Sequence, residues 1–348
     1  MRGKMKALMK AKPGPGLELV TVDIPEPGPL DLLVKVKATS ICGTDAHIYA
    51  WDAWSQSRIK PPIVIGHEFA GEVVEVGKMV GGFAKGDFLS AESHIPCGYC
   101  YQCRNDQQHI CGNLKILGVD TQGCFAEYVA LPAVCAWKND KSMKPEIASV
   151  QEPLGNAVYT TLVEPVSGLN VAVFGCGPAG LFSVGVANAA GAGKIFHIIK
   201  HEFRRAISKK MGANEIIRYD DPQLVEKIIN ATNGVGVDVV LEMTGNQQAI
   251  TQGFRILRKG GRFSAFGLPA GQPVQLDLNS LIFKGARIIC INGREMYRTW
   301  YQMAGLLNSG RLDPSPVITH RLKLEEFQKG FEAMKSADRQ SGKIVLIP

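Results

Sequence analysis

The sequence of 348 residues lacks any long apolar run, which sets the first limit on what the protein can be. A membrane span needs about 18 or more consecutive apolar residues, and the apolar stretches here stop well short of that length. The N-terminal segment reaches Lys10 after only a short apolar stretch, whereas a signal peptide needs an apolar core of about 7–15 residues. We therefore expect a chain that stays in the cytoplasm.

The charge imbalance is also small. The sequence has 39 Lys and Arg against 32 Asp and Glu, a formal net charge of +7, with 20% charged and 45% hydrophobic residues. This composition is typical of globular proteins and excludes disordered, collagen-like and coiled-coil chains. The densest basic pairs, Arg204-Arg205 and Lys209-Lys210, lack the interleaved aromatic residues of a nucleic-acid surface. We expect a small-molecule ligand, and neither nucleic acid nor a membrane.

The pattern of apolar residues divides the chain into two parts, as the length suggests. Short alternating segments punctuated by Gly and Pro fill the first 150 residues and predict a barrel-like β domain. From about residue 170, continuous apolar strands alternate with amphipathic helices, which predicts an α/β domain with a doubly wound parallel sheet. The last predicted strand, residues 343–347, has no crossover helix after it and is expected to return to the β domain.

Four of the nine cysteines lie within fifteen residues, as C-x2-C-x2-C-x7-C. Two-residue gaps let successive thiolates turn back onto one ion, and four sulfur atoms satisfy the tetrahedral preference of Zn2+. An iron–sulfur cluster is the alternative, but its bacterial motif continues with a three-residue gap and Cys-Pro, whereas this loop has a gap of seven followed by Gly. We therefore predict a structural zinc on Cys97, Cys100, Cys103 and Cys111.

Four further cysteines have apolar or small neighbours in the sequence. This context predicts buried thiols without a chemical role. The four are Cys124, Cys135, Cys176 and Cys290.

A glycine-rich turn between a predicted strand and a predicted helix carries the pattern G-x-G-x-x-G. Gly175 makes the tight turn, Gly177 removes a side chain where the backbone meets a pyrophosphate, and Gly180 lets helix and strand pack closely. With Pro178 as the first helical residue, the helix N-terminus offers free N–H groups to the phosphates. The turn predicts a dinucleotide site.

The acidic residue that normally follows such a turn is missing. A carboxylate about 20 residues on, at the end of the second strand, usually binds the adenosine ribose. Here that strand ends at Ile199, and Lys200, Arg204 and Arg205 stand near it. These cations favour a 2′-phosphate, as in NADP, unless they are only surface charge and NAD is held by other contacts. Lys200 and Arg204 are predicted cofactor contacts, and the choice between NAD and NADP stays open.

Cys42, His67 and Glu152 form a second possible metal-binding group. Cys, His and carboxylate are the ligands of catalytic zinc, which keeps one coordination position open. Such a metal lowers the pKa of an alcohol, so that a hydride can leave for a nicotinamide. Each residue alone is more often structural. Their occurrence together with a dinucleotide turn and a four-cysteine loop favours catalysis.

These features together resemble the zinc-dependent medium-chain dehydrogenases of the alcohol dehydrogenase superfamily, over the whole chain. The segment Gly66-His67-Glu68, the cysteine loop and the phosphate-binding turn carry the resemblance. It implies a GroES-like catalytic domain of residues 1–155 and 294–348, and a Rossmann domain of residues 156–293. Several stretches resemble the branch that oxidises L-threonine, namely residues 38–45, 47–49, 51, 54, 61–62, 94, 151–157, 292–294 and 299–301.

The resemblance also implies the catalytic metal's ligands, which would be Cys42, His67 and Glu68. Glu152 would be a further ligand or a close neighbour with a catalytic role. The implied reaction is oxidation of L-threonine to 2-amino-3-oxobutanoate with NAD, in a homotetramer.

The same resemblance implies a path for the alcohol proton. Thr44 would pass it through its hydroxyl and His47 through its imidazole. Asp45 would orient His67, and His94 would lie near the substrate.

Other functions remain as alternatives. One is a polyol dehydrogenase of the sorbitol type, or another secondary alcohol dehydrogenase, and the sorbitol-type enzymes share the Glu152-Pro153 stretch after the first domain. Threonine carries an ammonium and a carboxylate, for which Glu152 and Arg294 are the candidate partners, whereas a polyol needs neither charge. A nucleotide-binding relative without catalysis would show losses at Cys42, His67 or Thr44, and all three are present. A zinc-ribbon interaction module would not need the rest of the chain.

Overall fold

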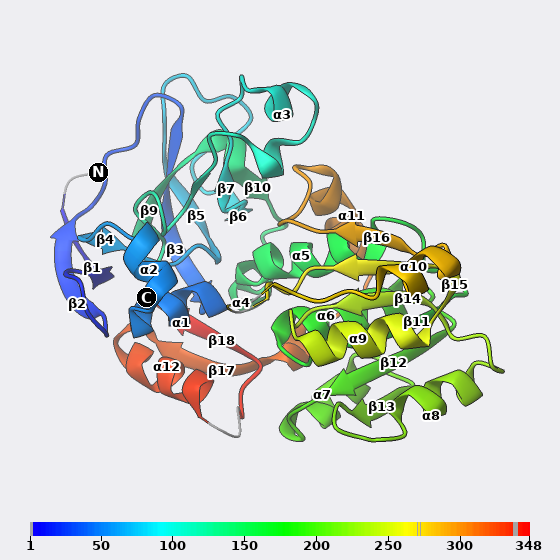
Figure 1. Cartoon of the computed structure of the whole chain (residues 1–348). Coiled ribbons are helices and arrows are strands. Elements are labelled where there is room, and N and C mark those ends of the chain that lie inside the picture. Colours follow the sequence, from blue (N-terminus) through cyan, green and yellow to red (C-terminus); the bar gives the residue numbers. More distant parts are fainter. Residues whose placement is uncertain (1–2, 270, 272, 337–339) are drawn as a thin grey trace. The chain divides into compact units, whose positions relative to one another are not determined.

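The computed structural model describes residues 3–269, 271, 273–336 and 340–348, and it divides the chain into two compact units (Figure 1). Unit 1 comprises Met1–Glu152 and Ile318–Pro348, and unit 2 comprises Pro153–Val317. The sequence-based boundaries placed residues 153–155 and 294–317 with the catalytic domain, whereas here both segments lie in unit 2. The physical reason is packing, because the 3-10 helix η3 (Ser315–Val317) contacts helices α6 (Pro178–Ala189) and α7 (Phe203–Lys210).

Unit 1 is built from sheets whose strands pair antiparallel, except for the parallel pair of β17 and β18, with short helices at their ends. A three-stranded sheet has the order β2-β1-β4, a larger sheet has the order β10-β6-β5-β3-β18-β17 with β9 also on β3, and β7 pairs with β8. The strands are β1 (Lys4–Lys10), β2 (Glu18–Asp23), β3 (Asp31–Ser40), β4 (Ile63–Val64), β5 (Phe69–Val76), β6 (Phe88–Ala91), β7 (His94–Ile95), β8 (Lys115–Ile116), β9 (Tyr128–Pro132), β10 (Ala136–Lys138), β17 (Ile318–Lys323) and β18 (Lys343–Ile347). The helices are α1 (Gly43–Ala50), α2 (Ala53–Arg58), α3 (Tyr101–Arg104), η1 (Gln108–Ile110), η2 (Ala133–Cys135), α4 (Pro145–Ser149), η4 (Leu324–Glu326) and α12 (Phe327–Lys335).

Strand β3 is the centre of unit 1, because β5, β9 and β18 all pair with it. Its apolar residues are buried in a core that includes Phe69, Phe125 and Phe331. The last strand, β18, pairs antiparallel with β3 through Val345 and Leu346. The expectation that the chain returns to the β domain is confirmed.

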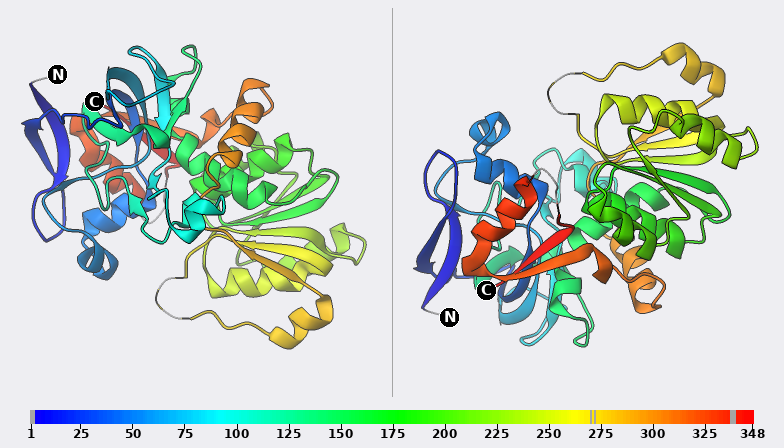
Figure 2. Two further views of the ribbon diagram at one scale, coloured as in Figure 1. Left: turned by 90° about the horizontal axis from the view of Figure 1, so that it is seen from above. Right: turned by 90° about the horizontal axis from the view of Figure 1, so that it is seen from below.

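Unit 2 is a doubly wound α/β domain, as predicted. Its sheet has the order β13-β12-β11-β14-β15-β16, with every neighbouring pair parallel. Helices α6 and α7 cover one face, and α8 and α9 cover the other (Figure 2). The strands are β11 (Asn170–Phe174), β12 (Lys194–Ile199), β13 (Glu215–Arg218), β14 (Val237–Glu242), β15 (Leu257–Ala265) and β16 (Arg287–Cys290), and the further helices are α5 (Gln151–Leu162), α8 (Leu224–Ala231), α9 (Gln247–Ile256), α10 (Leu278–Lys284) and α11 (Arg298–Asn308).

The strand order reverses between β11 and β14, where the chain crosses from one half of the sheet to the other. Dinucleotides bind at such a switch point, outside the carboxyl ends of the strands. The phosphate-binding turn follows β11 and therefore lies at this edge.

One prediction about the cysteines is wrong. Cys124, Cys135 and Cys176 are buried as expected, but Cys290 is exposed. Cys290 ends β16, the last strand of the sheet order, so its side chain has no further strand beside it. Among the described residues, no helix combines the length and apolarity that crossing a bilayer would require.

Candidate metal and cofactor sites

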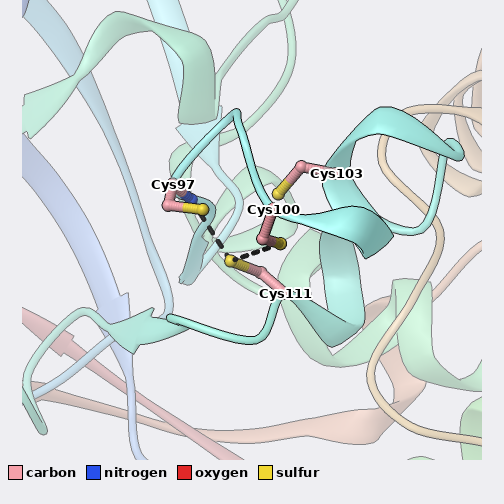
Figure 3. A group of neighbouring side chains, drawn as sticks. All are labelled: Cys97, Cys100, Cys103 and Cys111. Carbon is pink, nitrogen blue, oxygen red and sulfur yellow. Dashed lines mark hydrogen bonds between the residues drawn. The ribbon is translucent and has the colours of Figure 1, made fainter.

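The four cysteines of the predicted structural zinc come together in one loop. Their sulfur atoms lie within 4.8 Å of one another and turn toward a common centre (Figure 3). Cys103 lies on the short helix α3, and the others lie in the loop around it. This is the donor chemistry and spacing of a closed Zn2+ site, so the loop fits the ion predicted for it.

Backbone and side-chain N–H groups surround these sulfur atoms. Cys111 Sγ accepts from the backbone N–H groups of Cys97 and Asn113, both at 3.3 Å, and Cys97 Sγ accepts from Asn113 Nδ2 at 3.6 Å. Burial raises the pKa of Cys97, but N–H donors from Tyr99 and Asn113 outweigh it and lower the pKa to about 6. A thiol with that pKa is largely a thiolate at neutral pH, the form that binds a metal.

The second metal group gathers Cys42, His67 and Glu68, whose ligand atoms also lie within 4.8 Å of one another. Cys42 follows β3 as the N-cap of α1, and His67 and Glu68 immediately precede β5. Because Thr39 of β3 pairs with Phe69 of β5, the sheet brings the end of one strand to the start of the other. Thiolate, imidazole and carboxylate fit a catalytic zinc with an open position.

Asp45 lies beside His67 in this group. The Asp45 carboxylate accepts from the Cys42 N–H at 2.8 Å, and its other oxygen faces His67 Nδ1 at 3.7 Å. Burial raises the pKa of Asp45 to about 6. Burial lowers the pKa of His67, but the charges of Asp45 and Cys42 outweigh this and raise it to about 10. A carboxylate at Nδ1 is the usual arrangement when the other ring nitrogen, Nε2, binds a metal.

Glu68 has a cationic partner that the sequence did not reveal. Lys343 Nζ, from β18, contacts Glu68 Oε1 at 2.6 Å and Oε2 at 2.5 Å, and Ser40 Oγ donates to Oε2 as well. The side chains of Lys343 and Glu68 are 3% and 0% exposed. Burial lowers the pKa of Lys343, yet Glu68 and Cys42 raise it above its ordinary value. The Glu68 carboxylate of the metal group is therefore paired with the Lys343 ammonium.

Glu152 is not among the three gathered ligands, although its charge raises the pKa of His67 and of Lys343. It is buried, and Oε1 accepts from Ser93 Oγ at 2.6 Å. His94, the next residue, donates from Nδ1 to the carbonyl of His109 at 3.1 Å, in the cysteine lobe. Ser93 is a second contact that sequence reasoning missed.

The two predicted proton-path residues lie on α1. Thr44 Oγ1 is 3.9 Å from Cys42 Sγ. His47 is 62% exposed, donates from Nδ1 to Asp52 at 2.5 Å and stands edge-on to Trp54. Thr44 is thus beside the metal group, and His47 is open to water.

The phosphate-binding turn has the geometry that its glycines predict. Gly175 adopts φ +105°, in the region that favours glycine, and a Cβ on Gly180 would lie 1.8 Å from the Gly175 carbonyl oxygen. At Gly177, the N-cap of α6, a Cβ would meet nothing within 4 Å. The backbone at Gly177 is therefore open to a phosphate, whereas Gly175 and Gly180 are packed against other parts of the chain.

The predicted basic contacts near this turn differ in environment. Lys200 is exposed after β12, whereas Arg204 is buried and donates to the Cys176 carbonyl at 3.0 Å. Arg294, which the sequence predicts as a partner for the charges of threonine and not as a cofactor contact, is also buried, and it donates to Asn156 Oδ1 at 2.8 Å. Arg294 therefore packs against α5 in unit 2 instead of standing exposed to a ligand.

Comparison with known families agrees with this geometry. Residues 28–141 match the alcohol dehydrogenase GroES-like domain, and residues 178–309 match the zinc-binding dehydrogenase family. The chain therefore belongs to the zinc-dependent medium-chain dehydrogenases, with a GroES-like domain and a Rossmann domain.

Within that class the chain is similar to L-threonine 3-dehydrogenases. It is 50% identical to that of Bacillus licheniformis over 100% of both chains, and 49% identical to that of Pyrococcus horikoshii over 100% of this chain and 99% of the relative.

Solved structures give the same class. A zinc-binding dehydrogenase from Sinorhizobium meliloti bound to NADP has a TM-score of 0.91 at 30% identity, covering 99% of this chain and 100% of the other. An alcohol dehydrogenase from Thermus sp. ATN1 has a TM-score of 0.88 at 31% identity, covering 99% of each chain.

Proposed function

We propose that the protein oxidises L-threonine to 2-amino-3-oxobutanoate, with zinc at the reacting hydroxyl and NAD as hydride acceptor. The observation that carries the proposal is the group of Cys42, His67 and Glu68, in a chain whose other unit has a dinucleotide turn. The substrate follows from the full-length similarity to L-threonine 3-dehydrogenases, at 50% identity. Zinc, held by these residues, would polarise the alcohol and lower its pKa, and NAD would supply the hydride acceptor.

Side chains of the protein transfer the proton of the substrate alcohol. The Thr44 hydroxyl, beside Cys42, accepts the alcohol proton and passes it toward His47. His47 is fixed by Asp52 at one ring nitrogen and is 62% exposed, so it can release the proton to water. Asp45 keeps the His67 ring oriented for the metal.

Glu68 is the carboxylate ligand in this proposal, and Glu152 acts as a neighbour. The support is positional, because Glu68 and not Glu152 lies within 4.8 Å of both other ligands. Ser93 holds the buried Glu152 carboxylate, which then faces the substrate's ammonium as a counter-charge. His94 is the further residue that this proposal assigns to the neighbourhood of the substrate, and its ring is held by a bond to the His109 carbonyl.

A substrate panel tests the reaction. We expect kcat/KM with NAD to be highest for L-threonine, and much lower for sorbitol and 2,3-butanediol. A higher value for sorbitol would replace the proposal with a polyol dehydrogenase.

Metal removal tests the site. Chelation should abolish oxidation, and added zinc should restore it. Cys42→Ala should abolish oxidation while NADH binding persists, and Cys290→Ala, at an exposed cysteine of unit 2, should behave as the parent. Full turnover by a metal-stripped Cys42→Ala protein would refute the zinc mechanism.

Assembly as a homotetramer is part of the proposal. Strand β16 ends its sheet, and Ile288 on it is 42% exposed, so the strand edge is available to another chain. In helix α10, Leu278, Ile282 and Phe283 are 64%, 65% and 83% exposed, and exposed apolar side chains that lie together are typical of contacts between chains. Light scattering should give four copies, and Phe283→Glu should lower that number. A monomeric parent would contradict this part.

A cytoplasmic location belongs to the same proposal. The zinc loop needs four thiolates kept from oxidation, which is the condition of the cytoplasm. Fractionation of the native host would test it.

A further inference from the structure

We propose that Lys10 is a positioning residue for the proton path, because it anchors the end of helix α1 that carries His47. The inference rests on the proposed function, in which His47 passes the alcohol proton to water. It goes beyond that function, since Lys10 ends strand β1 and is itself a member of neither the metal groups nor the proton path.

Lys10 is a buried cation whose contacts are uncharged groups. The residue is 1% exposed, and burial lowers the pKa of its ammonium. Nζ donates to the carbonyl oxygens of Gly14 and Gly16, each at 2.6 Å, and within the described part of the chain it has no carboxylate partner. Lysine is rarely buried unless it is paired, and its lost hydration has to be replaced by well-placed acceptors. The contacts of Lys10 therefore fix the geometry of the segments around it.

The third contact of the ammonium is the indole of Trp51, whose ring centre lies 5.1 Å from Nζ. Trp51 is the C-cap of α1 and adopts φ +58°, in the left-handed region. A bulky residue rarely adopts this conformation, which persists only where the surrounding structure holds it. The cation over the indole and the Trp51 N–H, which donates to the His47 carbonyl at 2.9 Å, are two contacts that hold it.

The loop that follows Lys10 makes a second connection to α1. Gly14 and Gly16 have φ values of +128° and +96°, which only glycine adopts readily, and their carbonyl groups turn back to the Lys10 ammonium. The Gly16 N–H donates to the Tyr49 carbonyl at 2.7 Å. Lys10 thus contacts the end of α1 directly through Trp51 and indirectly through Gly16.

The anchored end of α1 determines where the His47 ring lies. Asp52 follows Trp51 directly, and its Oδ2 accepts from His47 Nδ1 at 2.5 Å. The other oxygen, Oδ1, accepts from the Ser55 N–H at 3.0 Å at the start of α2. A change in the backbone at Trp51 would therefore displace Asp52 and, with it, the His47 ring. A displacement of about 1 Å in a reacting group can slow a reaction about 100-fold, so the anchor matters for rate.

Hydrogen exchange of the full-length protein tests the anchor without any turnover. Lys10→Met keeps the length of the side chain and removes the ammonium from the two carbonyl groups and the indole. Residues 43–52 should exchange faster in this variant than in the parent. The matched control is Lys335→Met, at an exposed lysine whose ammonium lies 4.5 Å from the centre of the Tyr49 ring on the same helix. An exposed contact of this kind is weak, so the control should exchange as the parent does.

Stopped-flow measurement of NADH formation in the first turnover, with zinc-loaded protein and L-threonine, tests the link to His47. Lys10→Met should lower this rate about three- to tenfold and leave KM for L-threonine unchanged, because the proton path does not bind the substrate. His47→Gln should lower the rate further. The double variant Lys10→Met/His47→Gln should be no slower than His47→Gln alone, because Lys10 acts only through His47. Lys335→Met should react as the parent does.

The inference alone is overturned if His47→Gln is slow but the effects of the two substitutions multiply in the double variant. It is also overturned if Lys10→Met leaves the exchange of residues 43–52 unchanged, or if Lys335→Met has the same effects as Lys10→Met. A His47→Gln protein as fast as the parent would instead refute the proposed proton path, and this inference with it. If Lys10→Met does not fold, Lys10→Gln, which keeps a polar donor at the site, takes its place in the same measurements.

Discussion

Replacing Lys343 with Met should destabilise unit 1 strongly in the absence of zinc. The substitution keeps the length of the side chain and removes its charge, which leaves the Glu68 carboxylate buried without a cation. Since Lys343 and Glu68 are 3% and 0% exposed, water cannot take over the role of the ammonium. Breaking such a buried pair from one side costs about 3–5 kcal/mol. A domain is typically stable by only about 5–15 kcal/mol, so the effect should be large.

Bound zinc should reduce the destabilisation that Lys343→Met causes. If Glu68 is a zinc ligand, the ion supplies positive charge to the orphaned carboxylate, and zinc-loaded Lys343→Met should lose less stability than the zinc-free variant. The double variant Glu68→Gln/Lys343→Met removes both charges and should be more stable, without zinc, than Lys343→Met alone.

Urea unfolding followed by tryptophan fluorescence measures the effect. In a Trp300→Phe background, the remaining tryptophans, Trp51, Trp54 and Trp137, all lie in unit 1, so the signal reports that unit alone. The control is Lys6→Met, which breaks an exposed pair with Glu325 at 2.7 Å and should shift the midpoint far less. Equal shifts for the two variants, or a double variant as unstable as the sum of its single changes, would refute the reasoning.

Three other outcomes are expected. Burial lowers the pKa of His197 to about 4 in the folded protein. As the pH falls below about 6.5, the unfolded chain therefore binds a proton at this histidine before the folded chain does. The free energy of unfolding of unit 2 should decrease by up to about 3 kcal/mol between pH 6.5 and 4. Urea midpoints at several pH values should show this slope, and His197→Gln should flatten it. Cys103→Ser should lower the zinc content from two ions to one per chain with NADH binding intact, and unchanged metal content would contradict the four-sulfur site. Thr44→Ala should lower kcat roughly 100-fold and Thr44→Ser less, and equal rates in stopped-flow assays would remove Thr44 from the proton path.

Local patterns in the sequence were sufficient for the features whose residues lie close together in the chain. The four cysteines of residues 97–111 and the glycine turn of residues 175–180 are short segments, and their spacing largely determines their geometry. The parallel sheet could also be predicted, because the continuous apolar pattern of each strand and the amphipathic pattern of each helix are local in the sequence.

Contacts between distant segments could not be read from the sequence. Lys343 lies 275 residues from Glu68, and Ser93 lies 59 from Glu152, so only the folded sheets bring them together. Cys290 has apolar neighbours like the buried cysteines, and its exposure depends on the edge position of its strand. The proposal of Glu68 rather than Glu152 as the ligand likewise rests on the pairing of β3 with β5, which the sequence does not show.

The pairing of β18 with β3 has a consequence for biosynthesis. Unit 1 is formed from two pieces of chain that flank unit 2, and β18 lies between β3 and β17 in the larger sheet. A ribosome therefore releases all of unit 2 before it releases the strand that completes unit 1, so the Rossmann domain can fold first during synthesis. Closing the sheet joins residues about 300 positions apart, which makes it a late step with a high entropic cost. Because β18 also carries Lys343, the buried partner of Glu68 reaches its place only when this last strand docks.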